Sequence, residues 1–161
     1  MKSKVQRKAS RAKQGAEKAI RNKRARFDYA LDDTLTVGIA LDGRETKALR
    51  LGHGQLQGAY VTLKNNELWL INASIHGSTG IPIEDTAVTR DRKLLAKRRE
   101  IEALLQAKQQ GKTIVPLDIL TRGRFIKVRI ALGTGKRAYD KRQSLKRRDD
   151  QRNVARELSR H

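Results

Sequence analysis

The chain has 161 residues and a mass of 18.2 kDa, which allows one domain with extensions and excludes two full domains. It contains no cysteine, which excludes a disulfide framework and a thiolate metal site and suits a reducing cytoplasm. Its formal net charge of +20 indicates a polyanionic partner, and no apolar stretch resembles a signal peptide or a membrane span.

The positive charge is concentrated at the two ends of the chain. Residues 1–26 carry a net charge of +10 and residues 133–161 carry +6, which leaves only +4 for the longer middle. We therefore divide the chain into a basic arm at 1–21, a domain of nearly balanced charge at 22–132 and a basic tail at 133–161. Nucleic acid is the leading partner, because each neutralised phosphate releases condensed counterions. Neither basic end has the apolar face needed to insert into a membrane surface.

Alternating apolar and polar residues predict five strands, at 34–41, 59–63, 68–75, 113–120 and 125–132. Asn65-Asn66 is expected to form a tight hairpin turn, since asparagine tolerates positive φ. Pro116 has no N–H to donate, so its strand should lie at an edge or carry a bulge. In the last strand Val128 and Ile130 should face one way, with Lys127 and Arg129 facing the other.

Two helices are predicted, a short one over 45–51 ended by Gly52 and a longer one over 90–110. Thr89 is the expected cap of the longer helix, and Gly111 is expected to end it. Residues 76–89 should form a loop. The fold class is mainly β, a small antiparallel barrel with flanking helices, because the strands are short and follow one another closely.

The tail has only Leu145, Val154 and Leu158 as sizeable aliphatic residues. That is too little apolar area to offset the entropy of ordering it, so the tail should be disordered alone. Its composition favours helix once its charge is neutralised, so we expect it to become ordered on RNA.

Four segments in register give the chain a specific resemblance. They read NKRARFDY at 22–29, GRETKALRLG at 43–52, RDRKLLAKRREI at 90–101 and GKRAYDKR at 135–142. In this order and at these separations they resemble the bacterial SsrA-binding protein family, also called small protein B. The resemblance covers residues 20–148.

The resemblance implies a fold and a function that composition does not show. The family has an oligonucleotide-binding-type (OB-like) barrel, binds the tRNA-like domain of transfer-messenger RNA, and delivers that RNA to stalled ribosomes. Its tail occupies the empty decoding centre of 16S rRNA and the mRNA path. The resemblance thus implies a non-enzymatic adaptor of trans-translation, with no cofactor or metal, that is a monomer when free.

The resemblance also assigns roles by position. Residues matching the surface for transfer-messenger RNA are Asn22, Lys23, Arg24, Tyr29, Tyr60, Leu95 and Lys97, and the basic residues of the matching helices add Lys47, Arg50, Arg92 and Lys93. Residues matching the decoding-centre tail are Gly135, Lys136, Arg137, Tyr139, Asp140, Lys141 and Arg142. Tyr139 is expected to stack on an rRNA base, an interaction worth about 1–3 kcal/mol.

The chain departs from the family pattern at four places. Thr36 replaces an acidic residue, Ala87-Val88 replaces Asp-Pro, Thr134 replaces a basic residue and Asp150 replaces an aromatic residue. The Thr36 departure concerns an RNA contact, and the Asp150 departure concerns the last turns of the tail.

Several residues have two readings at this point. Glu45 can contact RNA or stabilise the start of its helix through the helix dipole. His53 can be read as a metal ligand, the acidic pair Glu84 and Asp85 as a nuclease site, and Trp69 as a residue that stacks on a base. We interpret His53 as a loop histidine, the two acids as solvated surface residues and Trp69 as a residue of the sheet. The sequence shows no metal-ligand spacing and no catalytic cluster around them. A ribosomal protein with basic extensions and an RNA-processing enzyme are the alternative functions.

Overall fold

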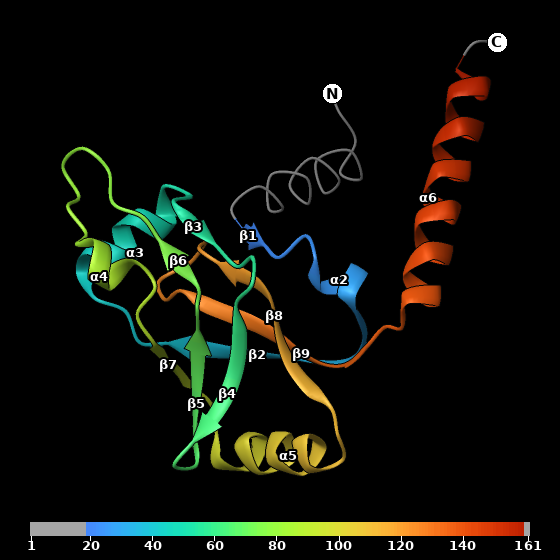
Figure 1. Cartoon of the computed structure of the whole chain (residues 1–161). Helices are drawn as coiled ribbons and strands as arrows, with labels where there is room; N and C mark the ends of the chain where they lie inside the picture. The colour runs from blue at the N-terminus through green and yellow to red at the C-terminus, as the bar shows by residue number, and fades with distance from the viewer. Residues whose placement is uncertain (1–18, 160–161) are drawn as a thin grey trace, which may run out of the picture.

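A computed structural model describes residues 19–159 (Figure 1). The strands in this range are β1 (Ala19–Arg21), β2 (Tyr29–Ile39), β3 (Gly54–Gln55), β4 (Tyr60–Lys64), β5 (Glu67–Ile71), β6 (Ser74–Ile75), β7 (Arg92–Leu95), β8 (Thr113–Leu120) and β9 (Lys127–Gly135). The helices are α2 (Ala25–Asp28), α3 (Gly43–Arg50), α4 (Asp85–Val88), α5 (Arg98–Gln109) and α6 (Ala138–Leu158). No helix in this range is long and apolar enough to cross a membrane.

The strands close into a ring of antiparallel pairs. Around the ring the order is β8, β4, β5, β7, β2 and β9, and β9 pairs again with β8. Closure leaves these strands without a free edge. β1 adds to β8, while β3 and β6 form a separate two-stranded sheet. The helices α3 and α4 lie at one end of the ring and α5 at the other (Figure 1). The predicted small antiparallel, OB-like barrel with flanking helices is therefore confirmed.

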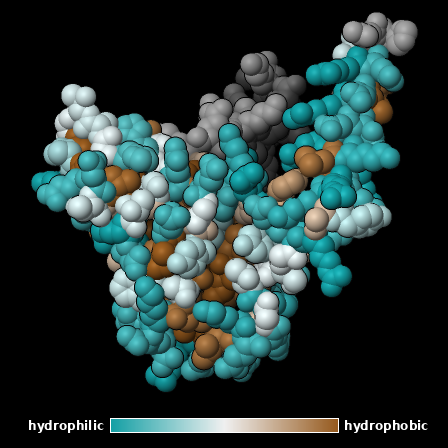
Figure 2. All heavy atoms as spheres, viewed as in Figure 1, coloured by the Kyte–Doolittle hydropathy of each residue, from teal (hydrophilic) through white to brown (hydrophobic). Residues whose placement is uncertain are grey.

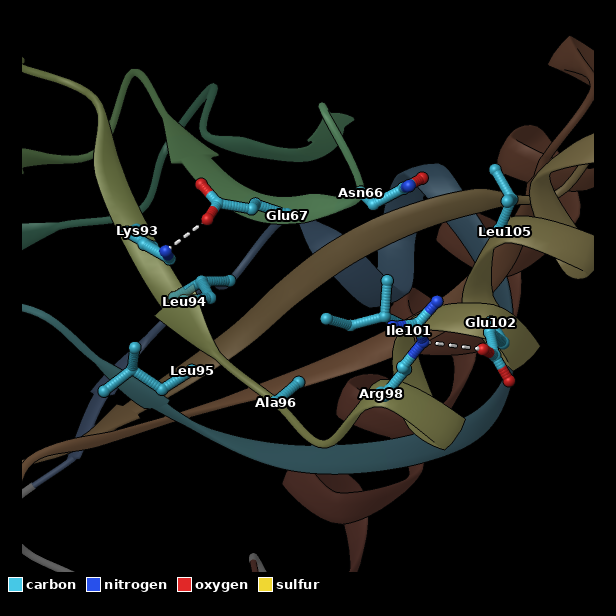
Figure 3. A pocket seen from close by; sticks show the side chains of 10 residues that line it. All are labelled: Asn66, Glu67, Lys93, Leu94, Leu95, Ala96, Arg98, Ile101, Glu102 and Leu105. Atoms are coloured by element: carbon cyan, nitrogen blue, oxygen red, sulfur yellow. Dashed lines mark hydrogen bonds and ion pairs between the residues drawn. The ribbon is translucent and has the colours of Figure 1, made fainter.

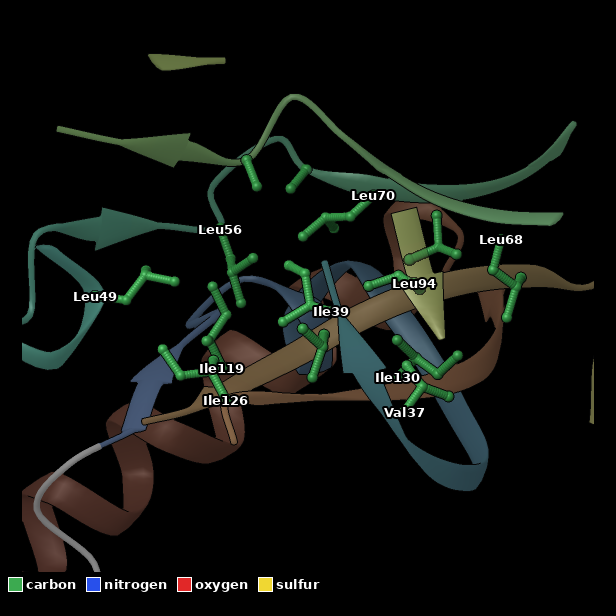
Figure 4. Close-up of a cluster of buried hydrophobic side chains, with 14 of the residues drawn as sticks. Val37, Ile39, Leu49, Leu56, Leu68, Leu70, Leu94, Ile119, Ile126 and Ile130 are labelled. Atoms are coloured by element: carbon green, nitrogen blue, oxygen red, sulfur yellow. The ribbon is translucent and has the colours of Figure 1, made fainter. Parts of the chain in front are cut away.

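Inward-facing aliphatic side chains from every strand of the ring fill its interior (Figure 4). Val37, Leu68, Leu94 and Ile130 come from four different strands and are all at most 2% exposed. In β9, Val128 and Ile130 are buried while Lys127 is exposed, which confirms the alternation predicted for this strand. Burial of each such side chain is worth about 1.5–3 kcal/mol, so the barrel interior provides most of the driving force for folding.

The predicted hairpin turn and the predicted glycine ends of the two helices are confirmed. Asn65 and Asn66 have φ angles of 51° and 59° and form the two-residue turn between β4 and β5. Gly52 and Gly111 follow the ends of α3 and α5 with φ of 89° and 84°, values that a residue with a side chain rarely adopts. Pro116 lies beside a register shift between β8 and β9, so its strand carries the bulge and is not an edge.

The prediction of one helix over 90–110 is wrong in its first third. Residues Arg92–Leu95 form strand β7, and α5 begins only at Arg98. The N-cap is Lys97 and not Thr89, and the Lys97 N–H donates to the Glu100 carboxylate at 2.7 Å. β7 fills the place between β5 and β2, and these pairings with distant segments override the local preference for helix.

Other element boundaries also differ from the predicted ones. β2 begins at Tyr29, ahead of the expected residue 34, and a register shift lies between Leu31 and Thr34. The expected strand over 68–75 is divided into β5 and β6 at Asn72, where φ is 57°. Residues Asp85–Val88 in the expected loop form one helical turn, α4. Ala19–Arg21, assigned above to the basic arm, pair with β8, and residues 1–18 lie outside the described range.

The tail forms α6, which stands away from the barrel and approaches it only beside α2 (Figure 1). None of its residues is buried, and its surface is largely hydrophilic (Figure 2). The helical preference inferred from composition is therefore visible in 138–158. Disorder of the free tail, and ordering on RNA, stay predictions.

Candidate nucleic-acid interface

A surface hollow of about 520 Å³ brings together four of the residues assigned to RNA binding. Asn22, Arg24 and Tyr29 come from the segment that leads into β2, and Tyr60 comes from the start of β4. The other side chains around it come from α2, including the Asp28 carboxylate, from the turn before β4 and from the start of β8. We call this hollow, together with Lys23, which lines a neighbouring hollow with Arg24, the 22–29 surface. It combines a guanidinium group with aromatic rings, the pairing that single-stranded nucleic acid prefers.

Asn22 holds this segment on the barrel. Its backbone N–H donates to the Leu117 carbonyl at 2.7 Å, and its side-chain amide donates to the Pro116 carbonyl at 3.0 Å. Its side-chain oxygen accepts from the Arg24 N–H at 3.3 Å. Asn22 thus positions the neighbouring cations, and its amide is largely used within the protein.

The charged and aromatic side chains of the 22–29 surface differ in solvent exposure. Lys23 and Arg24 are exposed, and Tyr60 is 50% exposed, so all three are open to a partner. Tyr29 is only partly exposed and packs against a small cluster that includes Ala25 and Leu117. Lys23 and Arg24 are thus free to bind phosphates, and the Tyr60 ring is free to stack on a base.

A second hollow, of about 450 Å³, lies between β7 and the start of α5 (Figure 3). Leu95 lies at its border and is 54% exposed, opposite Gly38 of β2. Lys93 also lines this hollow and forms an ion pair with Glu67. Lys97 is exposed at the start of α5. Lys93 and Leu95 therefore share this second hollow, apart from the 22–29 surface, and Lys97 lies between two of its lining residues along the chain.

Lys47 and Arg50 are exposed on α3, at a third place. Arg50 is not free there, because its Nη2 donates to the carbonyls of Gly123 and Arg124 at 3.0 and 3.1 Å. The guanidinium therefore holds the loop between β8 and β9 against α3.

Arg92 does not belong to the surface, which corrects its assignment. Its side chain is 0% exposed, and all five of its N–H groups are used. Nε donates to Glu45 at 2.9 Å, and the terminal nitrogens donate to four backbone carbonyls, those of Ala73, Arg90, Ala87 and Val88. Burial lowers the pKa of Arg92, and the Glu45 carboxylate opposes that shift. The signal missed was the strand period of β7, which turns position 92 inward.

Glu45 is likewise structural. It is 1% exposed and receives hydrogen bonds from both Arg90 and Arg92, the Arg90 Nε lying 2.8 Å from the carboxylate. The hydrogen bonding of the Arg90 guanidinium to the Glu45 carboxylate raises the pKa of Arg90. With Asp42, Glu45 also forms a capping box at the start of α3. The stabilising reading of Glu45 is therefore correct.

The root of the tail lies against the same segment that carries the 22–29 surface. The backbone N–H of Lys136 donates to the Asp28 carbonyl, and its ammonium group donates to the Arg26 carbonyl, both at 2.9 Å. Lys141 forms an ion pair with Asp28 at 3.1 Å and lies 5.9 Å from the centre of the Phe27 ring. The two groups of assigned residues thus meet at α2, and no local sequence signal links Asp28 to Lys141.

The remaining tail residues face solvent. Tyr139 is 67% exposed, and its hydroxyl accepts from the Gln143 amide at 2.7 Å. Asp140 accepts from the Arg137 N–H at 3.3 Å, so it caps the start of α6. Gly135 ends β9 opposite Tyr29, one residue before the tail leaves the sheet. Arg137 and Arg142 are also exposed, so the basic groups at this root of α6 point outward.

The structure shows the surroundings of Thr36, which stands where the family pattern has an acidic residue. Thr36 pairs with Arg129 across β2 and β9, and Arg129 in turn forms an ion pair with Asp118 of β8 at 3.3 Å. The carboxylate partner of Arg129 therefore comes from the strand on its other side. The Ala87-Val88 departure supplies only backbone carbonyls, to Arg92.

The residues with a second, catalytic reading are not gathered into a site. Within residues 19–159 no group of three or more His, Asp or Glu side chains could hold a metal ion. Glu84 and Asp85 are exposed at the start of α4, and Trp69 is a partly buried residue of β5 paired with Lys93. Two residues missing from the sequence assignments, Gln57 and Thr113, line the 22–29 surface. Both are common polar residues in turn or strand positions, so nothing local distinguishes them.

Comparison with known proteins identifies the family. The family model described as "SmpB protein" matches residues 19–160. An SsrA-binding protein of Mycobacterium sp. (strain KMS) is 46% identical over 86% of this chain and 83% of its own length. One of Trichormus variabilis is 44% identical, covering 85% of this chain and 90% of its own length.

A solved structure supports the same relationship. It is described as "tmRNA-SmpB: a journey to the center of the bacterial ribosome", and one of its chains is 36% identical to this one. The match has a TM-score of 0.62 and covers 75% of this chain and 86% of that chain. With the family model spanning nearly the whole chain and relatives above 40% identity, this chain belongs to the SmpB, or SsrA-binding protein, family.

Proposed function

We propose that this protein is the RNA-binding adaptor of trans-translation. It binds the tRNA-like domain of transfer-messenger RNA and delivers that RNA to ribosomes stalled on messages without a stop codon. The tail then occupies the empty decoding centre and mRNA path. The protein acts on ribosomes and therefore in the cytoplasm. When it is not bound to RNA, it is a monomer.

The observation that carries this proposal is the 22–29 surface. Arg24 is held beside Tyr60 by the Asn22 hydrogen bonds to β8, although Tyr60 lies far along the chain, and Lys23 is exposed next to Arg24 on the same segment. Cations on a rigid barrel can neutralise phosphates, and an exposed ring can stack on an unpaired base. This combination suits the folded, partly unpaired elbow of a tRNA-like RNA.

The tail supports the second half of the proposal. α6 carries exposed cations, starts beside α2 and stands away from the barrel (Figure 1). A basic helix of this kind suits a channel lined by phosphates. The protein supplies positioning and no bond chemistry, which separates it from an RNA-processing enzyme. Its tail motif, rather than its net charge, separates it from an rRNA-anchoring ribosomal protein.

Replacing Lys23 and Arg24 together with alanine is expected to flatten the salt dependence of binding to transfer-messenger RNA. Each lost phosphate contact removes about 0.7–0.9 from the slope of log K against log salt, so the pair should remove about 1.4–1.8. Filter binding at several salt concentrations measures the slope. Arg147→Ala with Arg148→Ala removes the same charge from exposed positions of α6 and should leave it unchanged. Equal slopes for the first variant and the parent would place the phosphate contacts elsewhere.

A further inference from the structure

The loop between β8 and β9 presents a bare aromatic ring. Phe125 is 68% exposed, although phenylalanine has no polar group to offset contact with water. The guanidinium carbon of Arg124 lies 5.3 Å from the centre of the Phe125 ring. A cation over one face leaves the other face open. None of the roles assigned above uses this loop.

The loop is held in place from both sides. Arg50 of α3 donates to the carbonyls of Gly123 and Arg124, and Ile126 directly after the ring is only 6% exposed. Gly123 has a φ of 99°, which permits the tight turn. A ring on a fixed loop loses little conformational freedom on binding, so its exposed face is ready for a partner.

The surroundings of the ring are strongly cationic. Arg122, Arg124 and Lys127 are exposed on or next to the loop, and Lys47 is exposed on the neighbouring α3. Between residues 119 and 139 the chain has six basic residues and no acidic one. Among the described residues, the ion pairs of the protein include neither Arg122 nor Arg124. Their charge is therefore available to an anion.

We propose that this loop is a second RNA-binding site, which takes one unpaired nucleotide. The base stacks on the open face of Phe125, while Arg122 and Arg124 bind the flanking phosphates. RNA fits this loop better than an acidic protein does, since only a nucleotide offers a flat π face and a phosphate together. Because Phe125 has no hydrogen-bonding group, the site tolerates any base. The proposal extends the proposed function, since it adds a contact away from the 22–29 surface.

A fluorescence experiment on the full chain tests the site. Phe125→Trp places a reporter on the loop, and the parent protein supplies the background because its one tryptophan is Trp69. The probes are a 12-nucleotide oligoadenylate, an abasic 12-mer with the same phosphates, and polyglutamate. We expect saturable quenching of the new tryptophan by oligoadenylate alone. Phe125→Ala should weaken oligoadenylate binding about five- to hundredfold.

Controls separate this site from the rest of the protein. Tyr60→Ala, made in the Phe125→Trp protein, should leave the quenching intact, because Tyr60 lies on the 22–29 surface. Equal quenching by the abasic 12-mer or by polyglutamate would overturn the proposal, since neither offers a base. Absence of quenching in a variant that still binds transfer-messenger RNA would overturn it and leave the proposed function standing. Quenching in a protein that shows no preference for transfer-messenger RNA would support the site at Phe125 and overturn the proposed function.

Discussion

Replacing Tyr139, Asp140 and Lys141 together with alanine is expected to abolish peptide tagging while leaving affinity for transfer-messenger RNA within about twofold. Tyr139 is 67% exposed on α6, beyond the barrel that carries the 22–29 surface. Loss of its stacking alone removes about 1–3 kcal/mol from ribosome engagement, and loss of the Asp140 cap weakens the start of the helix by about 1 kcal/mol. Tagging in a reconstituted translation system and a binding titration measure the two effects separately.

The matched control for this variant is Asp28→Ala. It breaks the same ion pair with Lys141 from the other side and leaves the tail sequence intact. That pair is partly exposed and is worth at most about 1 kcal/mol, so tagging should persist. Loss of tagging in Asp28→Ala would mean that the triple variant acts by detaching the tail. A large loss of transfer-messenger RNA affinity in the triple variant would contradict the division of labour between barrel and tail.

Glu45→Ala is expected to cost about 3–5 kcal/mol of the free energy of unfolding, because it leaves Arg92 buried without its carboxylate. The same change removes the Glu45 side of the capping box and the partner of Arg90. It also removes the interaction that opposes the burial-driven lowering of the Arg92 pKa. Urea denaturation followed by circular dichroism measures the change.

Glu102→Ala is the matched control for Glu45→Ala, since it removes a glutamate from an exposed ion pair with Arg98 on α5. Its expected cost is about 0.3–0.5 kcal/mol. Should Glu45→Ala fail to fold, Glu45→Gln keeps the shape of the side chain and should show a smaller loss in the same assay. A cost for Glu45→Ala as small as that of Glu102→Ala would contradict the buried network.

The parts of the fold that short-range chemistry decides could be predicted from the sequence. Asn65 and Asn66 tolerate the positive φ that a tight turn needs, and the alternation of buried and more exposed residues over 127–130 in β9 is contained within that strand. β7 could not be predicted in this way. Residues 92–95 become a strand only because β5 and β2 lie on either side, and neither neighbour is visible from the local helical preference.

The same distinction applies to the candidate interface. The segment 22–29 could be identified from its motif, but its attachment to β8 through Asn22 depends on a carbonyl at Pro116, far along the chain. The burial of Arg92 could not be predicted, because basic residues usually face solvent, whereas here a buried carboxylate and four backbone carbonyls accept its hydrogen bonds. Sequence position alone carries no information on which cation is already paired.

A binding titration at fixed salt tests the central claim most directly. It compares transfer-messenger RNA with bulk tRNA and with rRNA fragments of equal charge. We expect a clear preference for transfer-messenger RNA, because we propose that the 22–29 surface binds its tRNA-like domain by shape as well as by charge. Equal, salt-sensitive binding to all three RNAs would contradict the account and make the basic ends a general polycation.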